Sequence, residues 1–259
     1  MRAMWSGSIS FGLVNIPVKM FSGSESKTLD LDMLRKKDLC PIKYLRVCKT
    51  DNKEVPYEEI VKGYEYSDGE YIVLTDKDFE SASLEKTHLI DILDFVDERE
   101  IDTRYFEKPY YLEPDKTGPK AYALLREALK RSGRVGIASY VLRNRGSLGV
   151  IKPLGDLLVL NEIRFQNQLR NPEELKLPGS ENIREQEVEL ALSLIDQLTT
   201  TFEPSKYKDK YLDDLKQLIE EKAQGKEPRA PELPPQPAKV IDMMELLKES
   251  LKQKRKEAA

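Results

Sequence analysis

The stretch MRAMWSGSISFGLVNIPVKMF at Met1–Phe21 decides the fold of the first part of this chain. Large apolar side chains alternate with small or polar ones on both sides of Gly12. The residues that share a face are Trp5, Ile9 and Phe11, and then Val14, Ile16, Val18 and Met20. Alternation with a period of two is typical of β-strands, and a glycine between two such runs suits a chain reversal. The stretch therefore predicts two paired strands at residues 3–11 and 13–21.

Further strand-like runs follow as far as about Gln168. They lie at 41–48, 70–75, 87–95, 135–142, 148–151 and 157–164. One helix is expected among them, because Pro119 suits a first helical position and Gly133 suits a helix end. Its apolar stripe consists of Ala121, Leu124, Leu125, Ala128 and Leu129. Many strands with few helices predict an antiparallel sheet closed into a barrel, because closure leaves no exposed strand edge.

The last third of the chain changes from strand to helix periodicity. We expect one helix to begin at Asn182, in a capping box with Glu185, and a second to carry Tyr211 and Leu212. The segment Gly225–Ala238 has five prolines in fourteen residues and predicts an extended linker. An amphipathic stripe beyond it is typical of a helix that docks into a partner's groove. The expected domains are a barrel at 1–181, a helical arm at 182–224, the linker at 225–238, and a terminal helix with a short basic tail at 239–259.

The formal net charge of −4 hides a strong asymmetry along the chain. Residues 64–120 carry 16 acidic and 7 basic side chains, whereas residues 121–155 carry 7 basic side chains and one acidic one. Residues 35–62 carry 8 basic and 5 acidic side chains. A protein that is acidic on average can still line one surface with cations, so the net charge does not exclude a nucleic-acid partner.

Cys40, Cys48 and His88 are too few for a disulfide framework or a zinc site, so we expect free buried thiols and a structural histidine. The sequence has no nucleophile elbow, phosphate-binding loop or HExxH signature, which predicts a binding protein without metal, cofactor or catalytic residues, not an enzyme. It also has no signal peptide and no apolar run of about 20 residues. We therefore expect a cytoplasmic protein with no membrane partner.

Several stretches resemble, in chain order, the bacterial Ku family. The clearest are the opening stretch and EVPYEEIVKGYEYSDGEYIVLTDKDFE at Glu54–Glu80. Others are FVDEREIDTRYFEKPYYLEPD at Phe95–Asp115, KAYALLREAL at Lys120–Leu129, GIASYVLRNRGSLGVIKPLGDLLVLNEIRF at Gly136–Phe165, and KVIDMMELLKESL at Lys239–Leu251. The resemblance implies a homodimeric β-barrel protein that threads onto broken double-stranded DNA as a ring in non-homologous end joining. It also implies a strand-rich bridge at about 36–79, a helical dimerisation arm, an ATP-dependent DNA ligase as partner, and a place at the nucleoid.

A ring that accepts any broken end must contact phosphates rather than base edges, so its candidate residues are lysines and arginines. The first candidates are Arg143 and Arg145, because residues i and i+2 of a strand point the same way and two guanidiniums can clamp a phosphate. Asn144 and Gly146 indicate a strand end or a turn at the same place. The pair also resembles a DNA-contacting pair in the Ku fold. The other candidates are Arg35, Lys36, Lys37, Lys43, Arg46, Lys49, Lys53 and Lys62 at the bridge, and Arg2 and Lys19 beside the first strands.

The resemblance implies that the two arm helices embrace a second copy, while packing within one chain is the alternative. The expected dimerisation residues are Val188, Leu192, Ile195, Leu198, Leu215 and Leu218. The expected ligase-docking residues are Val240, Met243, Met244, Leu247 and Leu251. Two other functions stay open. One is a sequence-tolerant binder of single-stranded DNA or RNA, which would stack bases on tyrosines. The other is a dimeric scaffold that binds no DNA.

Overall fold

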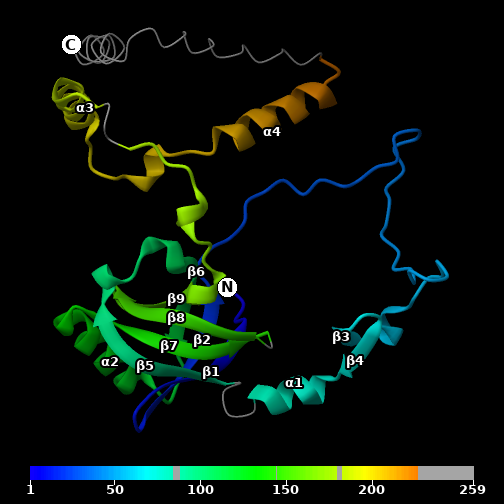
Figure 1. Ribbon diagram of the computed structural model, residues 1–259, viewed down its shortest axis with the longest axis horizontal. Helices are drawn as coiled ribbons and strands as arrows, with labels where there is room; N and C mark the ends of the chain where they lie inside the picture. Colours follow the sequence, from blue (N-terminus) through cyan, green and yellow to red (C-terminus); the bar gives the residue numbers. More distant parts are fainter. Residues whose placement is uncertain (84–87, 144, 180–182, 227–259) are drawn as a thin grey trace. The chain divides into compact units, whose positions relative to one another are not determined.

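The computed structural model describes residues 1–83, 88–143, 145–179 and 183–226 of the chain. The chain divides into two compact units, residues 1–171 and 172–259. The first unit contains a closed β-barrel and a long insertion, and the described part of the second contains the helices α3 and α4 (Figure 1). Within the described ranges, no helix is long and apolar enough to cross a membrane.

Seven strands form the barrel, which confirms the main prediction from the sequence. In order around the barrel they are β1 (Trp5–Phe11), β2 (Val14–Ser22), β6 (Phe106–Pro114), β9 (Leu157–Ile163), β8 (Arg145–Leu154), β7 (Arg134–Leu142) and β5 (Leu89–Asp97). The prediction of a wholly antiparallel sheet is wrong for one pair of strands, because β1 and β5 are parallel. Parallel neighbours need a long connection, and β2 with the 66 residues 23–88 provides it.

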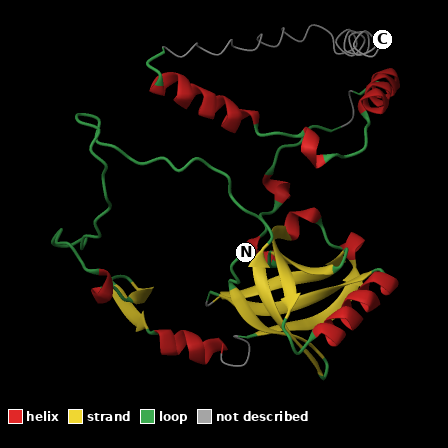
Figure 2. Cartoon of the chain, turned by 180° about the vertical axis from the view of Figure 1, so that it is seen from behind, coloured by secondary structure: helices red, strands yellow, loops and turns green. Residues whose placement is uncertain are grey.

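The seven strands curve around a single interior (Figure 2), and inward side chains from all of them make one apolar core. Ile9, Ile16 and Ile90 are among its fully buried members. A Cβ at Gly149 would lie 2.6 Å from Leu160 Cδ1, so a side chain there would force Leu160 to shift. A second cluster, formed by Val135, Val150 and Ile163, lies apart from this core. Short 3-10 turns η2 (Glu98–Glu100) and η3 (Thr103–Tyr105) join β5 to β6.

Helix α2 (Pro119–Ser132) packs on the barrel, and Gly133 ends it in the left-handed conformation with φ of 63°, as expected. The predicted stripe is partly wrong, because Leu124 and Ala128 are exposed whereas Tyr122 is buried with Leu125 and Leu129. The Tyr122 hydroxyl donates to Leu112 O at 2.6 Å and accepts from Leu158 N at 2.7 Å. A tyrosine that satisfies backbone groups at two strands can enter the core in place of an aliphatic residue.

The bridge, residues 36–79, is mostly irregular. Its regular elements are the 3-10 turn η1 (Tyr57–Glu59), the hairpin of β3 (Lys62–Ser67) and β4 (Glu70–Leu74), and the start of α1 (Asp76–Ser83). The predicted strand at 41–48 is wrong: this segment belongs to two local turns closed by single bridges, Leu34 with Pro41 and Val47 with Glu54. The segment forms no strand, because no neighbouring strand pairs with it in a ladder. No residue of the bridge is buried.

Among the strands and α-helices of the first unit, three were not predicted, namely β3, β6 and α1. In β6, Pro109 interrupts the pattern, and the ladder with β9 shifts register between Phe106 and Pro109. A bulge lets a proline sit inside a sheet without a missing ladder bond. The expectation of a single helix between the strands is wrong because α1 precedes β5.

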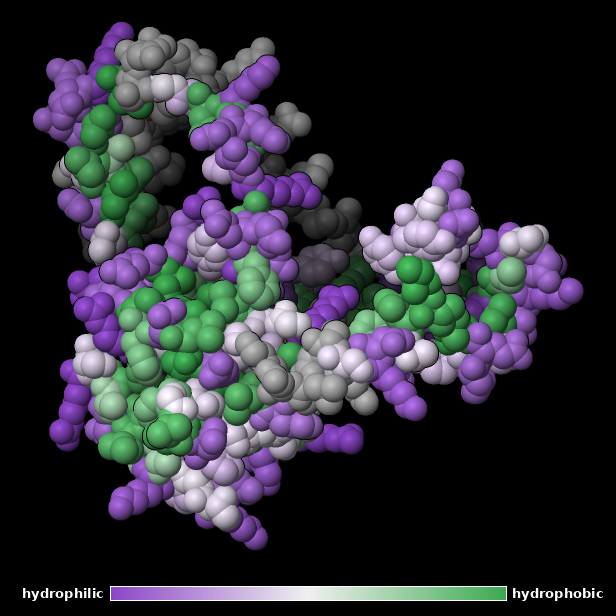
Figure 3. Space-filling view, turned by 60° about the horizontal axis from the view of Figure 1, so that its bottom comes forward, coloured by the Kyte–Doolittle hydropathy of each residue, from purple (hydrophilic) through white to green (hydrophobic). Residues whose placement is uncertain are grey.

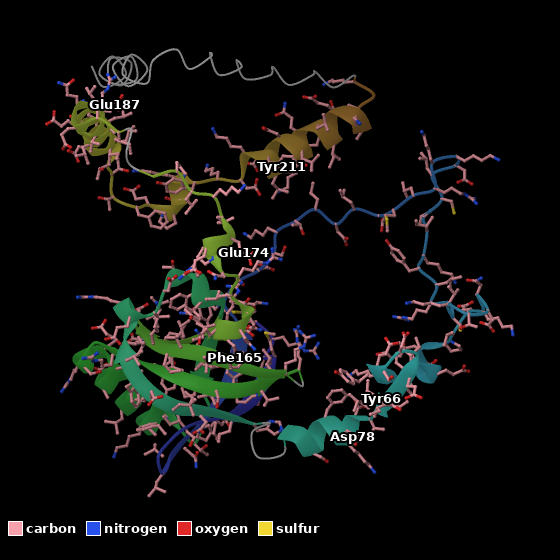
Figure 4. The ribbon with its side chains drawn as sticks, viewed as in Figure 1. Tyr66, Asp78, Phe165, Glu174, Glu187 and Tyr211 are labelled. Atoms are coloured by element: carbon pink, nitrogen blue, oxygen red, sulfur yellow. The ribbon has the colours of Figure 1, made fainter. Side chains whose placement is uncertain are left out.

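The second unit contains α3 (Glu185–Leu198) and α4 (Lys210–Ala223), with 3-10 turns η5 (Pro172–Glu174) and η6 (Pro204–Lys206), while η4 (Gln166–Gln168) ends the first unit. Both predicted helices are present, but α3 begins at Glu185 rather than Asn182. The backbone N–H of Arg184 donates to Glu187 Oε2 at 2.9 Å, which caps the first turn (Figure 4). Residues 180–182 and 227–259, with most of the expected linker and the whole terminal helix, lie outside the described ranges.

Candidate nucleic-acid interface

Arg143 and Arg145 lie at the tip of the β7–β8 hairpin. Leu142 pairs with Arg145, so only two residues connect the paired positions. Arg143 has φ of 53°, in the left-handed region that two-residue hairpin loops require. The expectation that both arginines point the same way from one strand is wrong, since Arg143 lies in the turn and Arg145 starts β8. Both side chains are exposed, and neither forms an ion pair with a described residue.

Strand directions place this hairpin opposite α2. Helix α2 follows the end of β6 and precedes the start of β7, whereas the hairpin joins the end of β7 to the start of β8. The strand pairings also bring the end of β2 and the start of β1, which Arg2 precedes, to the hairpin end. The arginine pair, the N-terminal segment, the end of β2 and the start of β5 therefore all lie at one end of the barrel. The connection from β2 to β5, which contains the bridge, thus leaves and re-enters the barrel at this end.

A polar network lies beneath the arginine hairpin. The Tyr110 hydroxyl donates to Glu162 Oε2 at 3.0 Å, and Ser147 Oγ donates to Glu162 Oε1 at 3.3 Å. Burial, reinforced by the charge of Glu162, raises the pKa of Tyr110 to about 12. Burial also raises the pKa of Tyr140, which faces Ser147 across the ladder. The tyrosine hydroxyls are therefore protonated at neutral pH, and Tyr110 is a hydrogen-bond donor there.

Sequence reasoning missed this network and two further cations at the same end of the barrel. Lys108 Nζ lies 5.7 Å from the centre of the Tyr110 ring, and Arg164 pairs with Glu107 at 2.7 Å. The signal that could have revealed the network is Glu162, a carboxylate inside the apolar run LLVLNEI. An acid at such a position needs hydrogen-bond donors from neighbouring strands.

Four of the eight bridge candidates are already engaged within the chain. Arg35 binds Asp38 through two hydrogen bonds, at 2.8 and 2.5 Å, and this contact lowers the pKa of the Asp38 carboxyl. Lys53 pairs with Asp51 at 3.2 Å. Arg46 lies 5.1 Å from the centre of the Tyr57 ring, and Lys62 lies 4.7 Å from that of Phe79. Arg35 thus holds the first local turn of this region together.

The other four bridge candidates are exposed lysines without an ion pair to any described residue, namely Lys36, Lys37, Lys43 and Lys49. Of the two candidates beside the first strands, Lys19 Nζ lies 3.9 Å from Asp115 Oδ1. Arg2 is exposed and borders a shallow pocket of about 340 Å³ with Ser22–Glu25 and Tyr111. The structure brings Arg2, Arg143 and Arg145 to one end of the barrel.

The expectation of buried thiols is wrong. Cys40 is exposed and Cys48 is partly exposed, because the bridge has no core to cover them. Hydrogen bonds from the backbone N–H groups of Thr50 and Asp51 lower the pKa of Cys48. His88 Nδ1 lies 3.0 Å from Ser6 O, and its ring lies near Trp5, in keeping with a structural role.

The apolar stripes of the two arm helices are open to solvent. Leu192 is 54% exposed and Ile195 is 58% exposed, and neither α3 nor α4 has a buried residue. Val188 and Leu198 are also exposed, while Leu215 and Leu218 are partly covered. The bridge likewise exposes apolar side chains, seen as green atoms at the right of Figure 3. Uncovered stripes of this kind mark interaction surfaces.

The fold is a closed β-barrel that presents two exposed arginines on a hairpin at one end. Residues 10–190 match the family model described as Ku70/Ku80 beta-barrel domain. The chain belongs to the Ku family.

Curated relatives match almost the whole chain. A protein of Cupriavidus necator is 45% identical over 99% of this chain and 79% of its own length. One of Opitutus terrae is 43% identical over 98% of this chain and 92% of its own. One of Bacillus subtilis is 40% identical over 99% of this chain and 83% of its own. Each of the three is named "Non-homologous end joining protein Ku".

Proposed function

We propose that this protein binds the ends of double-stranded DNA without sequence specificity, as a homodimeric ring, in non-homologous end joining. The observation that carries the proposal is the match of nearly the whole chain to relatives named for that process. The protein protects and bridges the ends and recruits an ATP-dependent ligase. It acts in the cytoplasm, at the nucleoid, without catalytic residues or a cofactor of its own.

The arginine hairpin supplies the first phosphate contacts. Arg143 and Arg145 are exposed and free of ion pairs to described residues, so little internal contact has to break before they bind DNA. Lys36, Lys37, Lys43 and Lys49 on the bridge are the next candidates for the same reason. Contacts of this kind position a duplex without reading its bases, which suits breaks of arbitrary sequence.

Dimerisation through the arm explains the uncovered stripes of α3 and α4. Burying a fully exposed Leu or Ile side chain contributes about 1.5–3 kcal/mol, and Ile195 has 58% of its surface left to bury. The six candidates from Val188 to Leu218 together offer an apolar surface that a second copy can cover by symmetry. The bridges of two copies then close the ring.

Salt dependence and strand preference test the DNA-binding proposal. We expect three or four phosphate contacts per subunit, which give a slope of log affinity against log salt of about −5 to −7. Duplex competitor should displace labelled duplex far better than single strands of equal length do. Exposed tyrosines of the bridge, such as Tyr64, Tyr66 and Tyr71, favour the alternative of a single-strand binder (Figure 4 labels Tyr66). Better competition by single strands would support that alternative, and a slope near zero would favour the scaffold.

Removing residues 240–259 should abolish stimulation of the cognate ligase and leave DNA binding and dimerisation intact. The reason is that a tethered docking helix raises the local concentration of the ligase at the break. The candidate contacts are Val240, Met243, Met244, Leu247 and Leu251. Ligation of linear duplex by the truncated and full-length chains is the measurement. A matched control removes only residues 252–259 and keeps the stripe. Equal stimulation by the 240–259 deletion would contradict the docking role.

A further inference from the structure

The arginine hairpin projects beyond its neighbour on one side of the barrel wall. The ladder between β8 and β9 begins with Leu148 paired to Ile163. Arg145, Gly146 and Ser147 therefore pair with β7 alone. Gly146 has no other atom within 4 Å of the position where a Cβ would lie, so nothing packs over that point. A two-stranded ribbon of this kind has little support of its own.

One side-chain contact ties the base of this ribbon to β9. Ser147 Oγ donates to Glu162 Oε1 at 3.3 Å, and the other carboxylate oxygen accepts from the Tyr110 hydroxyl on β6 at 3.0 Å. All three side chains are at least partly buried. Hydrogen bonds to an ionised acceptor are stronger than neutral ones, particularly away from water. The carboxylate thus connects three strands, β6, β8 and β9, directly below the hairpin.

We propose that Glu162 is a positioning residue for DNA binding, which holds Ser147 and thereby fixes how the hairpin presents Arg143 and Arg145 to phosphate. The inference rests on the proposed function and deepens it. A pre-ordered hairpin loses less conformational freedom when it binds, and this raises affinity without any new contact.

The direction of the effect separates positioning from simple electrostatics. Glu162→Ala removes a negative charge near the DNA-binding surface, and charge alone would then strengthen binding. Loss of positioning predicts the opposite, an affinity for linear duplex about tenfold lower. Glu162→Gln should stay within about twofold of the unchanged protein, because its amide can hydrogen-bond both hydroxyls. Glu100→Ala is the control, since Glu100 is an exposed acid near the α2 end of the barrel.

Ser147→Ala tests the same link without a change of charge. It should also weaken binding, and adding it to Glu162→Ala should cost little more, because the two residues act as one unit. If the arginines then bind fewer phosphates, the salt slope should become shallower by about 0.9 for each phosphate that is no longer bound. If Glu162 and Ser147 only stabilise the fold, their replacement would lower the melting temperature. The slope of log affinity against log salt, measured on the folded protein, would then stay unchanged.

The outcomes are distinguishable. Unchanged or tighter binding by Ser147→Ala and Glu162→Ala, while Arg143 and Arg145 variants bind weakly, would overturn the positioning role alone. Absence of salt-dependent binding to linear duplex in the unchanged protein would overturn the proposed function itself. If circular dichroism shows that Glu162→Ala does not fold, the affinity of the Ser147→Ala variant for linear duplex decides whether the positioning role holds.

Discussion

Replacing Arg143 and Arg145 together with glutamate should lower the affinity for linear duplex at least about a hundredfold at 0.1 M salt. Four arginines of a dimer would no longer bind phosphate, and four carboxylates would take their place against the DNA backbone. The slope of log affinity against log salt should become shallower by about 3 to 4. Electrophoretic or anisotropy titrations at several salt concentrations measure both quantities. The fold should be preserved, because both side chains are exposed at the hairpin tip.

A charge-matched control separates a local contact from the overall change in net charge. Lys116 and Lys120 are exposed and lie on the α2 side of the barrel, where β6 leads into α2. Their double replacement with glutamate changes the net charge equally and should reduce affinity only modestly, through long-range repulsion. Equal reductions of affinity in the two double variants would contradict a DNA contact at the hairpin.

Replacing Leu192 and Ile195 with glutamate should convert the protein to a monomer and abolish stable capture of DNA ends. Both side chains lie on the uncovered stripe of α3, and burying a carboxylate without a partner at an interface is strongly unfavourable. A monomer cannot close a ring, so it keeps only weak backbone contacts. Light scattering should report about 29.8 kDa instead of twice that mass.

The control for this variant adds the same charges to the other face of α3. Ser193→Glu with Gln197→Glu alters exposed polar positions and should leave a dimer. If the variant with glutamate at 192 and 195 still forms a dimer, the dimer interface lies elsewhere and the stripe of α3 is not part of it.

Local patterns in the sequence were sufficient to predict the barrel, because its strands bury one face in a shared core. Ile16, Val18 and Met20 on β2 alternate in the sequence and are buried in the structure. The same reasoning failed at 41–48, where the alternation of Lys43, Leu45 and Val47 meets no neighbouring strand. Alternation predicts a strand only where a ladder and a core are available to it.

The candidate site was predicted in part, by residue type rather than by geometry. Arg143 and Arg145 do lie together, but the left-handed turn that separates them depends on the register of β7 and β8. The link from Glu162 to Ser147 and Tyr110 joins residues 15 and 52 positions apart. Local periodicity does not reveal contacts at that separation. The ion pair of Arg35 with Asp38 joins residues only three positions apart, a separation at which local sequence does indicate a contact.

The most direct test of a ring that loads at DNA ends compares one duplex sequence in two forms, blunt-ended linear and covalently closed minicircle, in a binding assay at moderate salt. Ring closure predicts stable binding to the linear form and only weak, salt-sensitive association with the minicircle, because threading requires a free end. Equal affinity for the two forms would contradict the ring and leave an ordinary backbone-binding protein.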